Sequence, residues 1–309
     1  MKKATCSGNE FTFRHGNDRI RYRVVGERGP KLVLVHGFAD SMETFNTVVN
    51  SLSQFATCYV VNTLGAEALI QAHDHDIGLR RNVEIISRLV VDNDIKNIFG
   101  HSLGGNIASG VASSVVLNAD FIKNRKTNKI ELARRKRGDL FPMDNLFVMN
   151  SPQSPKDILM GNDIFNNIIY QTGLKSIIAR MFLKNLDWNT IVPIILKDIV
   201  QEIPPEYLDS IKKRYSDQKV RHAFLMYVAS IIGDIHNGFL QASLHHEVCN
   251  RTLIYASNDK LISPDAGNKI FAQSKEKTTL RSIDGGHMCH IKYGEKIANI
   301  VIDTMRLNR

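Results

Sequence analysis

The segment GHSLGG, with Ser102 at its third position, constrains the fold of this chain more than any other feature. Residues 95–99 before it are short, apolar and partly β-branched, which predicts a strand, and the small residues of 103–117 predict a helix. A Gly-x-Ser-x-Gly segment between a strand and a helix is typical of a nucleophile elbow. The turn is tight, and Gly100 and Gly104 remove a collision of side chains. Ser102 is thus predicted as a nucleophile; the alternative is a glycine-rich helix start that packs closely or binds phosphate.

A serine nucleophile needs a histidine as base and a carboxylate that orients the histidine. After an elbow of this kind the partners follow in the order acid, then histidine. Asp259 follows a predicted strand at 252–257, and His287 follows another at 278–283. Both candidates therefore lie just past a strand end, where open α/β sheets place their sites.

Other carboxylates near these loops are weaker candidates for the acid. Asp265 lies beyond Pro264, at a predicted helix start, and Asp284 is three residues from His287, so its chain must fold back to reach the ring. Asp259 itself could instead have a structural role, as a loop residue that caps the next helix.

An acyl-transfer intermediate also needs backbone N–H donors for its oxyanion. Leu103, directly after the candidate nucleophile, is one candidate. Residues 31–35 (KLVLV) predict an earlier strand, and Gly37 after it lets the backbone turn so that the Phe38 amide faces the site.

Together these residues resemble the α/β-hydrolase superfamily, in its compact branch with a lid. The resemblance depends on His-Gly-Phe at 36–38, the GHSLGG segment, Asp259 with Pro264 five residues on, and Gly-His at 286–287. It implies a mostly parallel sheet with helices on both faces and a helical lid after the sixth strand. It also implies a catalytic triad made of the serine, aspartate and histidine named above.

The expected fold class is therefore α/β, a mostly parallel sheet flanked by helices, with an inserted helical lid. We expect residues 1–152 and 248–309 to form the core and residues 153–247 to form the lid. Between 156 and 247 no strand alternation is seen, and apolar residues recur at helical spacing, which predicts about four helices.

The implied activity is hydrolysis of a carboxylic ester or thioester through an acyl-enzyme, with no metal and no organic cofactor. Relatives that open epoxides or displace halide carry an aspartate at the elbow, so Ser102 favours acyl transfer. Two alternatives remain open: hydrolysis of a carbon–carbon bond by the same triad, and a non-catalytic protein that binds a ligand in the lidded pocket.

The net charge of +9 is concentrated in residues 119–142, which hold eight Lys or Arg against three Asp or Glu. We expect this insertion to be mobile or helical on the surface. It is either a solvated face or a docking surface for an acidic carrier protein or an anionic membrane surface, through Arg134, Arg135, Lys136 and Arg137. Nucleic acid is disfavoured, because no aromatic residues are interleaved with the charges.

The cysteines and the N-terminal residues bear on the location of the protein. The four cysteines show no paired spacing and the N-terminal residues show no apolar run, so we expect a reduced, cytoplasmic setting.

Two histidine-containing clusters have other possible roles. The cluster His-Asp-His-Asp at 73–76 is expected to be a polar loop, because adjacent residues rarely converge on one metal ion. Either His245 or His246 is a candidate to face the substrate pocket.

Overall fold

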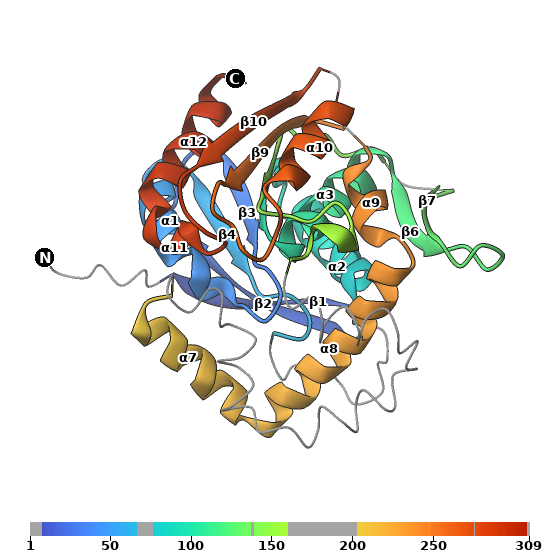
Figure 1. Ribbon diagram of the computed structural model, residues 1–309, viewed down its shortest axis with the longest axis horizontal. Coiled ribbons are helices and arrows are strands. Elements are labelled where there is room, and N and C mark those ends of the chain that lie inside the picture. The colour runs from blue at the N-terminus through green and yellow to red at the C-terminus, as the bar shows by residue number, and fades with distance from the viewer. Residues whose placement is uncertain are drawn as a thin grey trace, which may run out of the picture.

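The computed structural model describes residues 8–66, 77–136, 139–159, 203–246, 248–274 and 276–307. Its centre is an eight-stranded sheet with helices on both faces (Figure 1). The predicted α/β class with a mostly parallel sheet is confirmed. Within the described residues, no helix is long and apolar enough to cross a membrane.

The main sheet has the strand order β1-β2-β4-β3-β5-β8-β9-β10. Its strands are β1 (Asn9–His15), β2 (Asp18–Val25), β3 (Lys31–Val35), β4 (Thr57–Val61), β5 (Asn97–His101), β8 (Asn145–Met149), β9 (Asn250–Ala256) and β10 (Thr278–Ile283). β2 pairs antiparallel with β1 and with β4, and all other neighbours are parallel. The loops after β3, β5, β9 and β10 therefore leave the sheet at one edge, the edge of the strands' carboxyl ends.

Two layers of helices cover the sheet. α1 (Asn46–Leu52), α11 (Cys289–Lys292) and α12 (Gly294–Leu307) share one hydrophobic cluster with the sheet, and α2 (Leu79–Asp92), α3 (Leu103–Val116) and α10 (Asp265–Gln273) share the other. In β3, Leu32 and Leu34 belong to the first cluster, and Val33 and Val35 belong to the second. Burial on both faces explains why the parallel strands have nearly continuous apolar sequences.

The described part of the predicted lid includes a short 3-10 helix, η2 (Pro155–Asp157), and three α-helices: α7 (Pro205–Ser216), α8 (Gln218–His236) and α9 (Phe239–Leu244). An ion pair joins α8 to the core, since Arg80 Nε lies 2.7 Å from Asp234 Oδ1. Residues 160–202, which hold other apolar positions of the predicted lid helices, lie outside the described residues. The boundaries at 153 and 247 stay a prediction.

The expectation that the basic insertion is mobile or helical is wrong for its described residues. β6 (Ala119–Lys123) and β7 (Ile130–Arg134) pair antiparallel as a separate two-stranded sheet, which projects from the body in Figure 1. The physical reason is an apolar side on the hairpin: Ala119, Phe121 and Ile130 are buried. The Phe121 ring packs against Phe239 of α9, with ring centroids 5.3 Å apart.

Candidate active site

Ser102 occupies the turn between β5 and α3 with φ 56° and ψ −131°. Non-glycine residues rarely adopt such a conformation, which costs on the order of 1–3 kcal/mol. A Cβ on Gly100 would lie 2.2 Å from the carbonyl oxygen of Gly104, and one on Gly104 would lie 2.3 Å from the carbonyl oxygens of Val35 and His36. Gly100 thus permits the close approach of α3 to the strand, and Gly104 permits the close approach of α3 to the end of β3.

His287 and Asp259 form a buried hydrogen-bonded pair. His287 Nδ1 donates to Asp259 Oδ2 at 2.8 Å, and the two side chains are 5% and 1% exposed. Asp259 Oδ1 accepts the amides of Leu261 and Ile262 at 2.8 and 2.9 Å. The carboxylate therefore organises its own loop and holds the histidine tautomer whose Nε2 is free to act as a base.

The competing carboxylates lie elsewhere. Asp284 is exposed, and its Oδ1 accepts a hydrogen bond from Asn258 Nδ2 at 3.0 Å. Asp265 is exposed in the first turn of α10. Among the three aspartates considered from the sequence, Asp259 is the one that the structure brings to His287.

The main chain of His287 is fixed by two side chains that the sequence did not single out. Its carbonyl oxygen accepts hydrogen bonds from His101 Nε2 at 2.9 Å and from Asn150 Nδ2 at 3.0 Å. His101 ends β5 and Asn150 directly follows β8, so the two neighbouring strands hold the loop after β10 in place. The sequence carries no local signal for these contacts, because they depend on the strand order.

The Gly37–Phe38 peptide faces Ser102. A Cβ on Gly37 would lie 2.8 Å from Ser102 Cβ, so only glycine fits here. His36 Nδ1 donates to the Gly37 carbonyl oxygen at 2.8 Å, and His36 Nε2 accepts the Thr63 amide at 3.0 Å. Because a trans peptide places its N–H opposite its C=O, the Phe38 amide points away from His36.

Leu103 supplies the second candidate donor. It is the first residue of α3, where backbone N–H groups have no acceptor within the helix and favour negative charge. Phe38 and Leu103 also line the same cavity as Ser102. The two amides predicted as an oxyanion site belong to the loop after β3 and to the first turn of α3.

This cavity has a volume of about 120 Å³ and is shared by Ser102 and His287. Among the described residues the Ser102 hydroxyl has no hydrogen-bond partner, and contacts between a nucleophile and its base are often long before substrate binds. Most of the lining is apolar and comes from the predicted lid and the loop of Asp259, including Ile211, Val228, Ile231, Ile235, Leu261 and Ile262.

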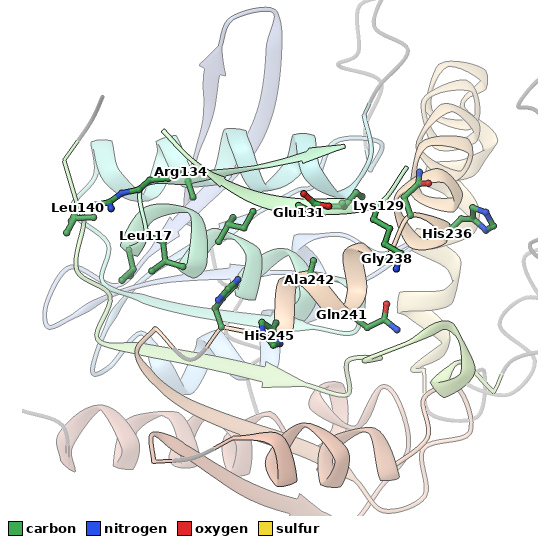
Figure 2. Close-up of a pocket in the computed structure, with 16 residues that line it drawn as sticks. Leu117, Lys129, Glu131, Arg134, Leu140, His236, Gly238, Gln241, Ala242 and His245 are labelled. Carbon is green, nitrogen blue, oxygen red and sulfur yellow. The ribbon is translucent and has the colours of Figure 1, made fainter. Parts of the chain in front are cut away.

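A second, larger hollow of about 1180 Å³ lies between the β6–β7 hairpin and the junction of α8 with α9 (Figure 2). Lys129, Arg134, His236 and Glu131 line it. His245 and His246 line this hollow and not the cavity of Ser102, so the structure does not bring either to the candidate site. The cluster at 73–76 lies outside the described residues.

Comparisons with known proteins bear on the fold. No family model matches the sequence, and no curated protein matches it. An α/β hydrolase fold protein from Burkholderia ambifaria is 17% identical, with a TM-score of 0.69 over 95% of this chain and 97% of that chain. The thioesterase domain from the curacin biosynthetic pathway is 14% identical, with a TM-score of 0.64 over 96% and 99% of the two chains.

The enol-lactonase from Burkholderia xenovorans is 16% identical, with a TM-score of 0.63 over 93% of this chain and 96% of that chain. At such low identities the likeness speaks to the fold alone. Strand order, the strained elbow and these three structures agree, and the chain has the α/β-hydrolase fold.

Proposed function

We propose that the protein is a serine hydrolase that cleaves a carboxylic ester or thioester. One observation carries the proposal: Ser102, at a strained elbow, shares a cavity with His287, whose ring is held by the buried Asp259. The names of two similar structures, a thioesterase domain and an enol-lactonase, support acyl chemistry by analogy.

In the proposed mechanism, Ser102 Oγ attacks the substrate carbonyl carbon while His287 Nε2 takes the hydroxyl proton. The Phe38 and Leu103 amides donate hydrogen bonds to the oxyanion. Collapse of the tetrahedral intermediate expels the alcohol or thiol, which receives the proton from His287. Water then loses a proton to His287 and attacks the acyl-enzyme, which releases the acid and restores Ser102.

The lining of the cavity indicates an apolar group on the substrate. Isoleucine and valine side chains of α8, together with Ile203 and Ile211, face the space beside Ser102. Each buried methylene of a substrate chain contributes about 0.8 kcal/mol of binding free energy. We therefore expect kcat/KM to rise with chain length until the chain fills the cavity.

The proposal is tested with a fluorophosphonate probe and a panel of p-nitrophenyl esters and acyl thioesters. The probe should label the wild type, and Ser102→Ala should abolish labelling and lower turnover by about 10³-fold or more. Ser109→Ala is a matched control on the same helix, since Ser109 Oγ donates to the Gly105 carbonyl oxygen at 2.8 Å within its own helix. It should label like the wild type.

Two results would contradict the proposal. A folded Ser102→Ala protein that keeps a tenth of the wild-type turnover would exclude Ser102 as the nucleophile. A wild-type protein that neither labels nor hydrolyses any ester or thioester of the panel, yet binds apolar ligands, would favour the non-catalytic alternative.

A further inference from the structure

Three side chains from distant parts of the sequence converge behind the candidate site. Asp40 follows β3, His101 ends β5, and His290 lies on α11. One potential ligand atom from each lies within 4.8 Å of the others. The residues are 6%, 1% and 0% exposed, so the cluster is part of the interior.

Each member of this cluster has one buried polar atom without a hydrogen-bond partner among the described residues: Asp40 Oδ2, His101 Nδ1 and His290 Nδ1. A buried polar atom without a partner costs about 1–3 kcal/mol, and more when it is charged. Because these three atoms belong to residues that converge on one point, a single bound group could satisfy all of them.

The other nitrogen of each histidine is already engaged. His101 Nε2 donates to the His287 carbonyl oxygen at 2.9 Å, and His290 Nε2 lies 2.7 Å from Thr44 Oγ1. Histidines that bind metals usually donate their second ring N–H to an outer partner, which fixes the tautomer and aims the other nitrogen at the ion. With Nε2 protonated, the Nδ1 atoms of both rings carry free lone pairs.

Asp40 is held in a similar way. Its Oδ1 accepts the Ser41 amide at 2.8 Å and also accepts the hydroxyl of Tyr207 from α7. These contacts orient the carboxylate and leave Oδ2 as the atom without a partner.

The two histidine rings are packed against each other in the interior. The rings of His101 and His290 lie close together, with centroids 4.2 Å apart.

We propose that Asp40, His101 and His290 form a binding site for one divalent first-row transition ion, with Zn²⁺ as the test ion. Two imidazoles and one carboxylate are ligands of zinc and its neighbours, whereas Mg²⁺ prefers oxygen ligands. A bridging water is the competing occupant, because Arg214 of α7 already brings a positive charge to the surroundings of Asp40, where both charges act on Tyr207 and His36. Asp40 and His101 also line the cavity of Ser102, which gives an ion a path to the site.

Titration of the full-length, chelator-treated protein with ZnCl₂, followed by calorimetry, tests the site. We expect saturable binding of one Zn²⁺ per chain, a rise in Tm with bound zinc, and no competition by millimolar Mg²⁺. No saturable binding, or equal competition by Mg²⁺, would overturn the proposal and leave a buried water as the occupant.

His290→Gln is the sharpest variant, because its amide can keep the contact with Thr44 while the Nδ1 ligand is lost. It should weaken zinc binding by about 100-fold or more. His236→Gln, at an exposed histidine, and a double His245→Gln, His246→Gln variant should bind zinc like the wild type. Unchanged affinity in His290→Gln, or lost affinity in the double variant, would place the ion elsewhere.

Co²⁺ absorption of the wild-type protein keeps the proposal testable even if His290→Gln does not fold. Ligands of nitrogen and oxygen give visible ligand-field bands without a thiolate charge-transfer band. A thiolate band would move the ion to a cysteine, such as the neighbouring Cys289, and would overturn the assignment.

Discussion

His287 is fixed through both its ring and its carbonyl group. Asp259 holds the ring, and His101 and Asn150 hold the carbonyl oxygen. A histidine that serves as base in one step and as acid in the next must stay in place while its charge changes. The hydrogen bonds to the ring and to the carbonyl group hold His287 in place without a contact to Ser102.

Asp259→Asn tests the role of the carboxylate. The amide can still accept the loop amides of Leu261 and Ile262, but its NH₂ group facing His287 would favour the tautomer with a protonated Nε2. We expect kcat to fall by about 10³–10⁴-fold while the fold is retained, measured on a p-nitrophenyl ester and by circular dichroism. Asp284→Asn is the matched control, because Asp284 is exposed and bonds Asn258. A larger loss at Asp284 would refute the assignment of the acid.

The β6–β7 hairpin carries much of the basic insertion away from the main sheet. Arg125, Lys126 and Lys129 are exposed around its turn. Arg135, one of the cations singled out from the sequence, pairs instead with Asp120 at 2.6 Å, and Arg137 lies outside the described residues. Docking of an acidic partner on this hairpin stays a proposal, and the cations at the turn are the better ones to test.

Arg125→Gln, Lys126→Gln and Lys129→Gln in one variant should leave hydrolysis of a small neutral ester unchanged. With an acyl group on an acidic carrier protein, or an ester in anionic vesicles, kcat/KM should fall, because these charges raise the rate of encounter. Added salt should remove the difference, since exposed charges are screened within about 10 Å at 0.1 M salt.

The control for this variant changes three exposed cations on other elements, Arg281, Lys292 and Lys296, to glutamine. The control should match the wild type on both kinds of substrate. An equal loss of kcat/KM in the two variants would show that only the net charge of the protein matters. No loss in either variant would show that the hairpin is a solvated face without a docking role.

The elements that the sequence predicted correctly are those with local signals. Predicted strands at 252–257 and 278–283 overlap β9 and β10, and the predicted helix at 103–117 overlaps α3. The hairpin was missed although its buried Phe121 and Ile130 flank a polar turn, because dense charge obscured a short alternation. Strand alternation is weak evidence in segments of about five residues.

In the candidate site too, the residues with local sequence signals were predicted and those without such signals were not. Ser102 lies directly after β5, and Asp259 and His287 lie three and four residues after β9 and β10, so their convergence at one edge follows from the parallel strands. Asn150 and the cluster of Asp40, His101 and His290 could not be predicted. Their convergence depends on which strands are neighbours and on where α11 packs, and no local pattern encodes either.

The candidate site lies at the carboxyl edge of the sheet, and members of one hydrophobic cluster, including Leu103, Leu261 and Met288, line its cavity. At this edge His36 links two neighbouring strands, because its Nε2, just after β3, accepts a hydrogen bond from the Thr63 amide, just after β4. It is 1% exposed, and burial is the main cause that lowers its pKa below the usual range, although nearby Asp40 partly opposes this. Protonation of His36 is therefore coupled to unfolding of the entire fold.

The sign of this coupling predicts acid sensitivity. Below the unfolded pKa of about 6.5, the unfolded chain binds a proton that the folded chain does not, so the free energy of unfolding falls as the pH is lowered. The contribution of one such histidine is at most about 1.4 kcal/mol per pH unit.

His36→Gln tests this dependence, because glutamine retains an acceptor for the Thr63 amide but does not titrate. Urea unfolding with chelator present should show the wild type more stable at pH 7 and the gap to His36→Gln narrowing toward pH 5. A constant gap for His36→Gln would mean that His36 is protonated equally in the folded and unfolded chains.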